Sequence, residues 1–193
     1  MHMAKGDYGY ISGKKKSTLV WLLLMIIIGL AIFGLGLLLN KLEGKNIFTV
    51  LAILMVLPAA KFLTTYIVLF PYRTVSREKY DKLLTVLNSE EEGTKVYADM
   101  VITSPEKVMN LDFLVVKGHK VLAVAGKEKQ DISYIQNYLK KGVTNWARGC
   151  SVRIYDADAF EKFLREVKKL ESTVWEGEEF EEVTAYLNSL IIQ

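Results

Sequence analysis

Two long apolar stretches dominate the first part of the chain. Residues 19–39 contain no charged side chain, and at a helical rise of about 1.5 Å per residue they reach roughly 30 Å, the thickness of a bilayer's hydrocarbon core. The second stretch, residues 47–70, is interrupted only by Pro58 and Lys61. The pattern predicts two transmembrane helices, one for each stretch, after an N-terminal tail at residues 1–18.

A cleaved signal peptide is the alternative interpretation of the first stretch. Its apolar region is longer than signal peptides usually carry, and no small-residue cleavage site precedes the second stretch. The polar segment between the two stretches, "NKLEGKN", suits a tight turn. We therefore expect a transmembrane helical hairpin over residues 19–70.

Basic residues flank this hairpin on both of its outer sides. The turn carries only Lys41 and Lys45, offset by Glu43. Because cytoplasmic flanks are richer in Lys and Arg than translocated loops, we expect a multi-pass protein of a bacterial-type cytoplasmic (inner) membrane, with both termini in the cytoplasm. The single cysteine, Cys150, cannot form an internal disulfide, which fits a reducing compartment. The flanking residues are Lys5, Lys14, Lys15 and Lys16 before the hairpin, and Arg73, Arg77, Lys79 and Lys82 after it.

The rest of the chain, residues 71–193, alternates helical and strand patterns and is expected to form a cytosolic domain. Ser76 and Asp131 are placed as N-caps of two of the helices. Two strands are apolar at every position in their centres, which is typical of a sheet covered by helices on both faces. The fold class is therefore expected to be α/β. Helices are predicted at 76–88, 131–147, 157–172 and 178–191, and strands at 95–104, 111–117, 120–126 and 151–156.

The segment "LDFLVVKGHKVLAVAGK", residues 111–127, predicts a β-hairpin. A two-residue turn with glycine first is typical of type II′, and it would pair the two lysines that flank Gly118 and His119. Counting back from that turn puts Asp112 opposite Ala125. Because side chains on one face of a strand recur at every second residue, Asp112, Ala125 and Lys127 are then expected on the same face.

The run from the helix at 76–88 through this hairpin resembles the nuclease-related domain, a branch of the PD-(D/E)XK restriction-endonuclease-like superfamily. The resemblance covers roughly residues 76–170. It implies a restriction-endonuclease-like fold in which Asp112 matches the first metal-binding carboxylate and Lys127 the catalytic lysine. Ala125 stands where the family has its second carboxylate.

The alanine at this position argues against hydrolysis. Mg²⁺ in proteins is usually anchored by one or two carboxylates with waters and substrate phosphate, and a methyl group supplies neither a ligand nor a charge. Asp99, on the preceding strand, and Glu128, beside the lysine, are possible substitute carboxylates. We therefore expect a catalytically degenerate binding or scaffold module without a cofactor. A Mg²⁺-dependent, membrane-anchored nuclease is the alternative, with Asp112 as a metal ligand.

Asp112 and Lys127 also have a purely structural interpretation, as an ion-pair partner and the solvated end of a strand. Charge does not favour nucleic acid as a partner, because residues 72–193 hold 18 Lys and Arg against 20 Asp and Glu. The expected partners are the lipid bilayer and either another protein or a second copy of the chain.

Lys61 is the one charged residue within the two apolar stretches. A charge inside a membrane is costly and is by default a functional hypothesis. Lys61 lies about nine residues from the predicted end of the second helix, within partial reach of the headgroups, so snorkelling is the simpler expectation. The alternative is an oligomeric membrane component that uses Lys61 in a pathway or in binding a partner.

Overall fold

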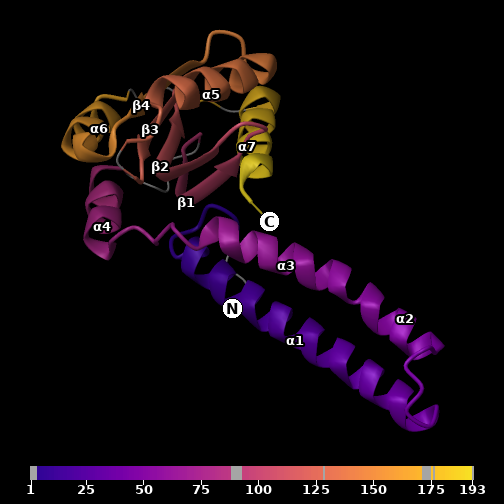
Figure 1. Ribbon diagram of the computed structural model, residues 1–193. Coiled ribbons are helices and arrows are strands. Elements are labelled where there is room, and N and C mark those ends of the chain that lie inside the picture. The colour runs from indigo at the N-terminus through magenta and orange to yellow at the C-terminus, as the bar shows by residue number, and fades with distance from the viewer. Residues whose placement is uncertain (1–3, 88–92, 128, 171–174, 176, 193) are drawn as a thin grey trace. The chain divides into compact units, whose positions relative to one another are not determined.

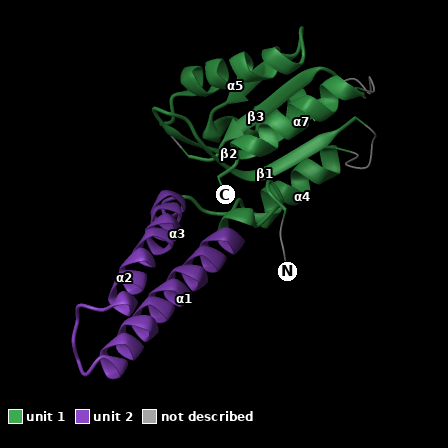
Figure 2. Cartoon of the chain, turned by 90° about the vertical axis from the view of Figure 1, so that its right-hand side faces the viewer, with its two compact units in different colours: residues 1–11, 72–193 green, residues 12–71 purple. Residues whose placement is uncertain are grey.

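The computed structural model describes residues 4–87, 93–127, 129–170, 175 and 177–192. The chain divides into two compact units (Figure 2): Ser12–Pro71 is one, and Met1–Ile11 together with Tyr72–Gln193 is the other. The second unit is called the α/β domain below.

The Ser12–Pro71 unit consists of apolar helices. They are α1 (Tyr10–Leu39), α2 (Ile47–Leu54) and α3 (Val56–Leu69). α1 begins at Tyr10 and runs through Lys14, Lys15 and Lys16, so the helix starts before the apolar stretch of residues 19–39. Lysine is a good helix former, and absence of charge marks the part of a helix suited to lipid, not where the helix begins.

Two helical spans in this unit are long and apolar enough to cross a membrane: Tyr10–Leu39 and Ile47–Leu69. Their large apolar side chains are mostly exposed, with Leu38 at 75% and Leu57 at 70%. The core helix of a soluble protein would bury such side chains, so this exposure favours membrane association.

The second span is interrupted at Met55, close to the position where Pro58 should disturb the helical hydrogen bonds. α2 ends at Leu54 and α3 begins at Val56, with Met55 between them. Pro58 lacks an N–H, and its ring clashes with the carbonyl four residues earlier, which is that of Leu54. Asn46 caps the start of α2 by accepting a hydrogen bond from the Thr49 N–H at 3.0 Å.

The α/β domain is built on a four-stranded sheet in the order β1-β2-β3-β4. β1, β2 and β3 are antiparallel neighbours, and β4 lies parallel to β3. A parallel pair needs a crossover connection, and α5 (Ile132–Trp146) supplies it. The strands are β1 (Lys95–Thr103), β2 (Val108–Lys117), β3 (Lys120–Ala125) and β4 (Ser151–Tyr155).

Helices cover both faces of this sheet, as the apolar strands predict (Figure 1). On one face, α5 and α7 (Glu178–Leu190) pack on a core that includes Leu111, Leu114 and Val116. On the other, α4 (Arg77–Val86) and α6 (Phe160–Lys168), which follows the short helix η1 (Ala157–Ala159), pack on a core that includes Phe113 and Val115. The mixed α/β class is confirmed.

Local capping explains where two of these helices begin. The Ser76 hydroxyl accepts a hydrogen bond from the Lys79 N–H at 3.4 Å, and the Asp131 carboxylate accepts one from the Tyr134 N–H at 2.9 Å. Each bond satisfies an N–H of the first helical turn that has no partner inside the helix. Both N-caps were expected from the sequence and are confirmed.

The outer edge of β1 is partly covered by the two ends of the domain. The Gly6 carbonyl accepts a hydrogen bond from the Ala98 N–H at 2.7 Å, and the Ile192 N–H donates to the Val101 carbonyl at 3.0 Å. Ile102 and Ile191 form an isolated antiparallel bridge. Pairing of this kind protects an edge strand from other chains, and residues before α1 become part of the α/β domain.

Candidate functional site

The turn of the β2–β3 hairpin differs from the expected type. Gly118 and His119 have φ values of 54° and 57°. Positive φ at both central residues is typical of a type I′ turn, so the expected type II′ turn is wrong. The pairing of Lys117 with Lys120 is confirmed. His119 is exposed and stacks on Trp175, with ring centroids 4.6 Å apart.

The pairing at Asp112 also differs from the expectation. Ala125 pairs with Leu111, Val124 pairs with Phe113, and the register shifts between them, which leaves Asp112 in a bulge. Cross-strand partners share a face, so Ala125 lies on the α5 and α7 side with Leu111. The carboxylate of Asp112 instead reaches α4, where Lys79 Nζ lies 3.6 Å from its Oδ2. Asp112 and Ala125 therefore do not share a face.

Gly126 is closely packed against the bulge. A Cβ added there would collide with the side-chain oxygens of Asn110 and Asp112. Asn110 has little freedom to move, because it is buried and donates to the Met100 carbonyl at 3.1 Å. A carboxylate at position 126, the next residue along from Ala125, is therefore excluded on steric grounds.

Asp99 stands opposite Asp112 on the neighbouring strand. The pairs Ala98–Phe113 and Met100–Leu111 bracket the two carboxylates. Asp99 has φ +53°, an αL conformation that Asp tolerates better than most residues. The expected substitute carboxylate is thus adjacent in register to Asp112.

Both oxygens of Asp99 are already hydrogen-bonded to the main chain. Oδ1 accepts from the Val75 N–H at 2.8 Å, and Oδ2 accepts from the Gly9 N–H at 2.9 Å. Gly9 immediately precedes α1, and Val75 follows α3 by a few residues. This one carboxylate, 1% exposed, therefore fixes the two segments through which the α/β domain joins the Ser12–Pro71 unit.

Burial shifts the titration of both acids. It raises the pKa of Asp112 to about 6, with Lys79 opposing the rise and the neighbouring charge of Asp99 adding to it. It also raises the pKa of Asp99, although hydrogen bonds led by those from Val75 and Gly9 oppose that rise. A carboxyl group whose pKa is raised in this way is a candidate for a functional site, because burial disfavours its charged form.

These residues do not fit a Mg²⁺ ion. Among the residues that the structure describes, no group of three or more His, Cys, Asp or Glu side chains could hold a metal. Asp112 faces a lysine, and the oxygens of Asp99 accept backbone N–H groups. Mg²⁺ needs several oxygen ligands in near-octahedral geometry, which this pair does not offer. Glu128 lies outside the described residues.

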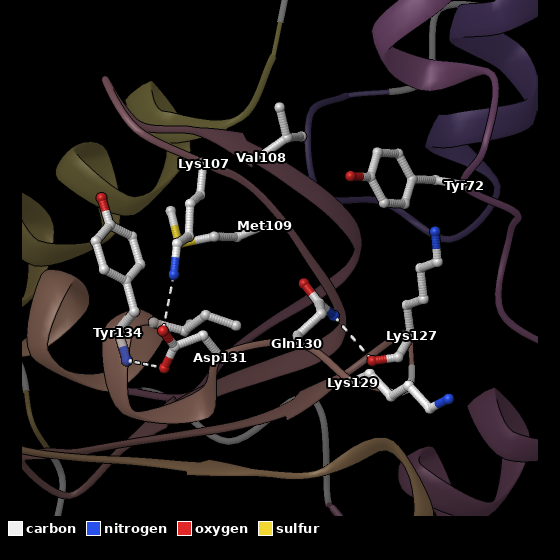
Figure 3. A pocket seen from close by; sticks show the side chains of 10 residues that line it. Tyr72, Lys107, Val108, Met109, Lys127, Lys129, Gln130, Asp131 and Tyr134 are labelled. Atoms are coloured by element: carbon white, nitrogen blue, oxygen red, sulfur yellow. Dashed lines mark hydrogen bonds and ion pairs between the residues drawn. The ribbon is translucent and has the colours of Figure 1, made fainter.

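Lys127 belongs to a different place, a surface cavity of about 440 Å³ (Figure 3). Its ammonium lies 5.8 Å from the centre of the Tyr72 ring, and no described contact joins it to Asp112. The cavity gathers residues from the start of β2, the β3–α5 loop, the first turn of α5 and the segment after α3. They are Tyr72, Lys107, Val108, Met109, Lys127, Lys129, Gln130, Asp131, Tyr134 and Ile135.

The cavity is basic, and one lysine in it is neutralised. Lys107 Nζ lies 2.7 Å from Asp131 Oδ2, which lowers the pKa of Asp131 and raises that of Lys107. Both groups therefore stay charged at neutral pH. The described residues provide no ion-pair partner for Lys127 or Lys129. The local charge is positive.

Most of this cavity was missed in the sequence. The alternation of lysines in "GKEKQD" and the Asp131 N-cap are signals that could have pointed to it. Tyr72 and Lys107 carry no such signal, because they are far from this segment along the chain and only folding brings them to it.

Lys61 is exposed on α3, in the Ser12–Pro71 unit. Its backbone carbonyl accepts a hydrogen bond from the Thr65 hydroxyl at 3.1 Å. Within the described part of the chain, no carboxylate pairs with it. Snorkelling and partner binding therefore both stay open as predictions.

Comparison of the whole chain with models of protein families, with curated proteins and with solved structures finds no match.

Proposed function

We propose that this chain is a membrane-anchored binding module whose cytosolic domain is a degenerate relative of the nuclease-related domain and does not cut phosphodiesters. The arrangement of Asp99 is the observation that carries the proposal. Its two oxygens hold Gly9 and Val75, so the one described carboxylate adjacent to Asp112 serves the fold. Among the residues that the structure describes, no second carboxylate is then left for a hydrolytic site.

The order of elements supports the family part of the proposal. A helix, three antiparallel strands, a crossover helix and a parallel fourth strand follow one another. Asp112 and Lys127 keep the residue types that the resemblance implies, whereas their separation into two different places argues that the catalytic constellation has been lost.

The anchor is proposed to be a two-pass hairpin in a cytoplasmic membrane, with both termini and the α/β domain in the cytoplasm. The exposed apolar side chains of α1, α2 and α3 support insertion. The excess of basic residues outside the turn supports this orientation. In this proposal Lys61 snorkels toward the headgroups, and its use by an oligomeric partner is the alternative.

A metal-dependent nuclease is the second candidate function, and one observation favours it. Asp99 and Asp112 share a register position, and the charge of Asp99 helps to raise the pKa of Asp112, as neighbouring carboxylates do in catalytic pairs. Hydrolysis would require Asp99 to release at least one backbone N–H before it could bind a metal. Breaking buried hydrogen bonds of a charged group costs about 1.5–3 kcal/mol each.

One experiment separates the two candidates. The purified full chain is titrated calorimetrically with Mn²⁺ and Mg²⁺ and incubated with single- and double-stranded DNA and RNA. We expect no saturable metal binding and no cleavage above that of an Asp112→Ala preparation purified in parallel. Metal-dependent cleavage that Asp112→Ala abolishes would establish the nuclease instead.

A further inference from the structure

The cavity around Lys127 is the part of the α/β domain that the proposed function leaves without a ligand. Its volume, about 440 Å³, lies within the roughly 300–1,000 Å³ typical of small-molecule sites. Every residue that lines it belongs to the α/β domain. The site is therefore complete within one compact unit.

Its charges suit an anion. Lys107 is neutralised by Asp131, whereas Lys127 and Lys129 have no described carboxylate beside them. In Figure 3, Lys127 extends toward Tyr72 on the side of the cavity away from Lys107 and Asp131, and Lys129 extends from the neighbouring backbone in another direction. Lysine binds phosphate as a compact point charge. A phosphate placed against Lys127 would meet a net positive wall.

The backbone around these lysines is held in a defined geometry. Gln130 donates from Nε2 to the Asn110 carbonyl at 2.8 Å and to the Lys127 carbonyl at 3.2 Å, while its Oε1 accepts from the Asn110 N–H at 2.9 Å. Lys129 has φ +62°, which is uncommon for a residue with a side chain. Residues held in such sparsely populated conformations cluster at functional sites.

The remaining walls suit a ligand that also carries apolar groups. These walls are formed by the side chains of Val108, Met109 and Ile135 and by the rings of Tyr72 and Tyr134. Burial raises the pKa of the Tyr72 phenol, so this wall of the cavity carries no negative charge. Only Pro71 separates Tyr72 from Phe70, the residue that caps α3. An anionic lipid headgroup is therefore one source of ligand to be tested.

We propose that this cavity binds a phosphate-bearing anion of headgroup size, with its phosphate against Lys127 and Lys129 and its carbon skeleton against the tyrosine and aliphatic walls. The anion is supplied either by an anionic phospholipid or by a soluble phosphate ester. This inference rests on the proposed binding function and adds the chemical class of the ligand.

The test uses the full chain in dodecyl maltoside micelles, which contain no phosphate. One arm titrates glycerol 3-phosphate by calorimetry. The other adds phosphatidylglycerol, or zwitterionic phosphatidylcholine as the comparison without net charge, and counts retained lipid by native mass spectrometry. Both arms are repeated on the double variant Lys127→Gln/Lys129→Gln. The matched control is Lys140→Gln/Lys141→Gln, which removes the same charge from two exposed lysines of α5 outside the cavity.

Binding of glycerol 3-phosphate that weakens at least about tenfold in the cavity variant, and not in the control, supports a soluble source. Retention of phosphatidylglycerol over phosphatidylcholine that only the cavity variant loses supports a lipid source. No binding in either arm, or equal losses in the two double variants, overturns the proposal. Metal-dependent cleavage would contradict the proposed function and leave these binding results interpretable, because neither arm contains a divalent metal.

Discussion

Asp99 and Asp112 stand at one register position of β1 and β2, and Asp99 accepts two hydrogen bonds from the main chain. Asp99 holds the segment that enters α1 and the segment that leaves α3, whereas the described partner of the Asp112 carboxylate is the ammonium of Lys79 at 3.6 Å. Two residues of the same type at one register position therefore have different physical roles. Substituting each by asparagine should change stability in opposite directions at neutral pH.

Asp99→Asn should destabilise the α/β domain. Asparagine tolerates the αL conformation of this position, so the backbone is preserved. Its NH₂ group, however, would replace one acceptor and face the N–H of Gly9 or Val75. Loss of the buried charge offsets part of this effect, and we expect a net loss of about 1–3 kcal/mol in the free energy of unfolding. Urea unfolding of the full chain in detergent, followed by tryptophan fluorescence, measures it.

Asp112→Asn should stabilise the domain at pH 7.5 and change little at pH 4. The pKa of Asp112 is raised to about 6 in the folded state, above its ordinary value of 3.8. Folding therefore favours the protonated acid, and stability is lost as pH rises from about 4 through 6. The charge at pH 7.5 then costs up to about 3 kcal/mol. The same unfolding measurement at the two pH values tests this, and a variant less stable than the parent at pH 7.5 would contradict it.

Gly126→Ala should destabilise the domain although alanine is a small residue. Its Cβ would collide with the side-chain oxygens of Asn110 and Asp112, and the hydrogen bond from Asn110 to the Met100 carbonyl resists their movement. Overpacking of this kind typically costs about 1–3 kcal/mol. Gly44→Ala is the matched control, because no atom lies within 4 Å of a Cβ there. Equal melting temperatures for the two variants would mean that position 126 has room for a side chain.

The proposed topology predicts which sites a membrane-impermeant maleimide can label in intact cells. Cys150 is buried and is the single native cysteine, so Cys150→Ser supplies a background without thiols. A cysteine at Glu43, in the turn before α2, should be labelled from outside. A cysteine at Asp156, in the α/β domain, should be labelled only after the membrane is permeabilised. Labelling of both sites in intact cells would refute the proposed orientation.

The helices and strands follow from local patterns, and most of them were predictable. Apolar stretches determined the membrane-type helices, Pro58 determined the break after Leu54, and Ser76 and Asp131 determined two helix starts. Each of these features depends on residues within one or two helical turns, which a sequence displays directly. α1 begins before its apolar stretch, because lysines favour a helix whether or not lipid surrounds it.

The pairing at Asp112 could not be read from the hairpin by counting. The bulge adds one residue to β2 and shifts the alternation of its side chains, so that Leu111 and Phe113 face opposite cores. Asp112 thereby leaves the face on which Ala125 lies. What stabilises this bulge comes from other elements: Lys79 on α4 contacts Asp112, and Asn110 is fixed by Gln130 and by the Met100 carbonyl. Asp112 and Lys127, which the sequence suggested as the remnant of one catalytic site, therefore lie in two different places in the fold.

By itself, then, the sequence determined the α/β class, the two apolar helical spans and the residues that start the helices, because these depend on neighbours along the chain. Only the tertiary structure decided that Asp99 fixes Gly9 and Val75, and that Tyr72, Lys107 and Lys127 share a cavity. Those contacts join segments separated by tens of residues. Their formation depends on how the strands pair and pack, which no local pattern encodes.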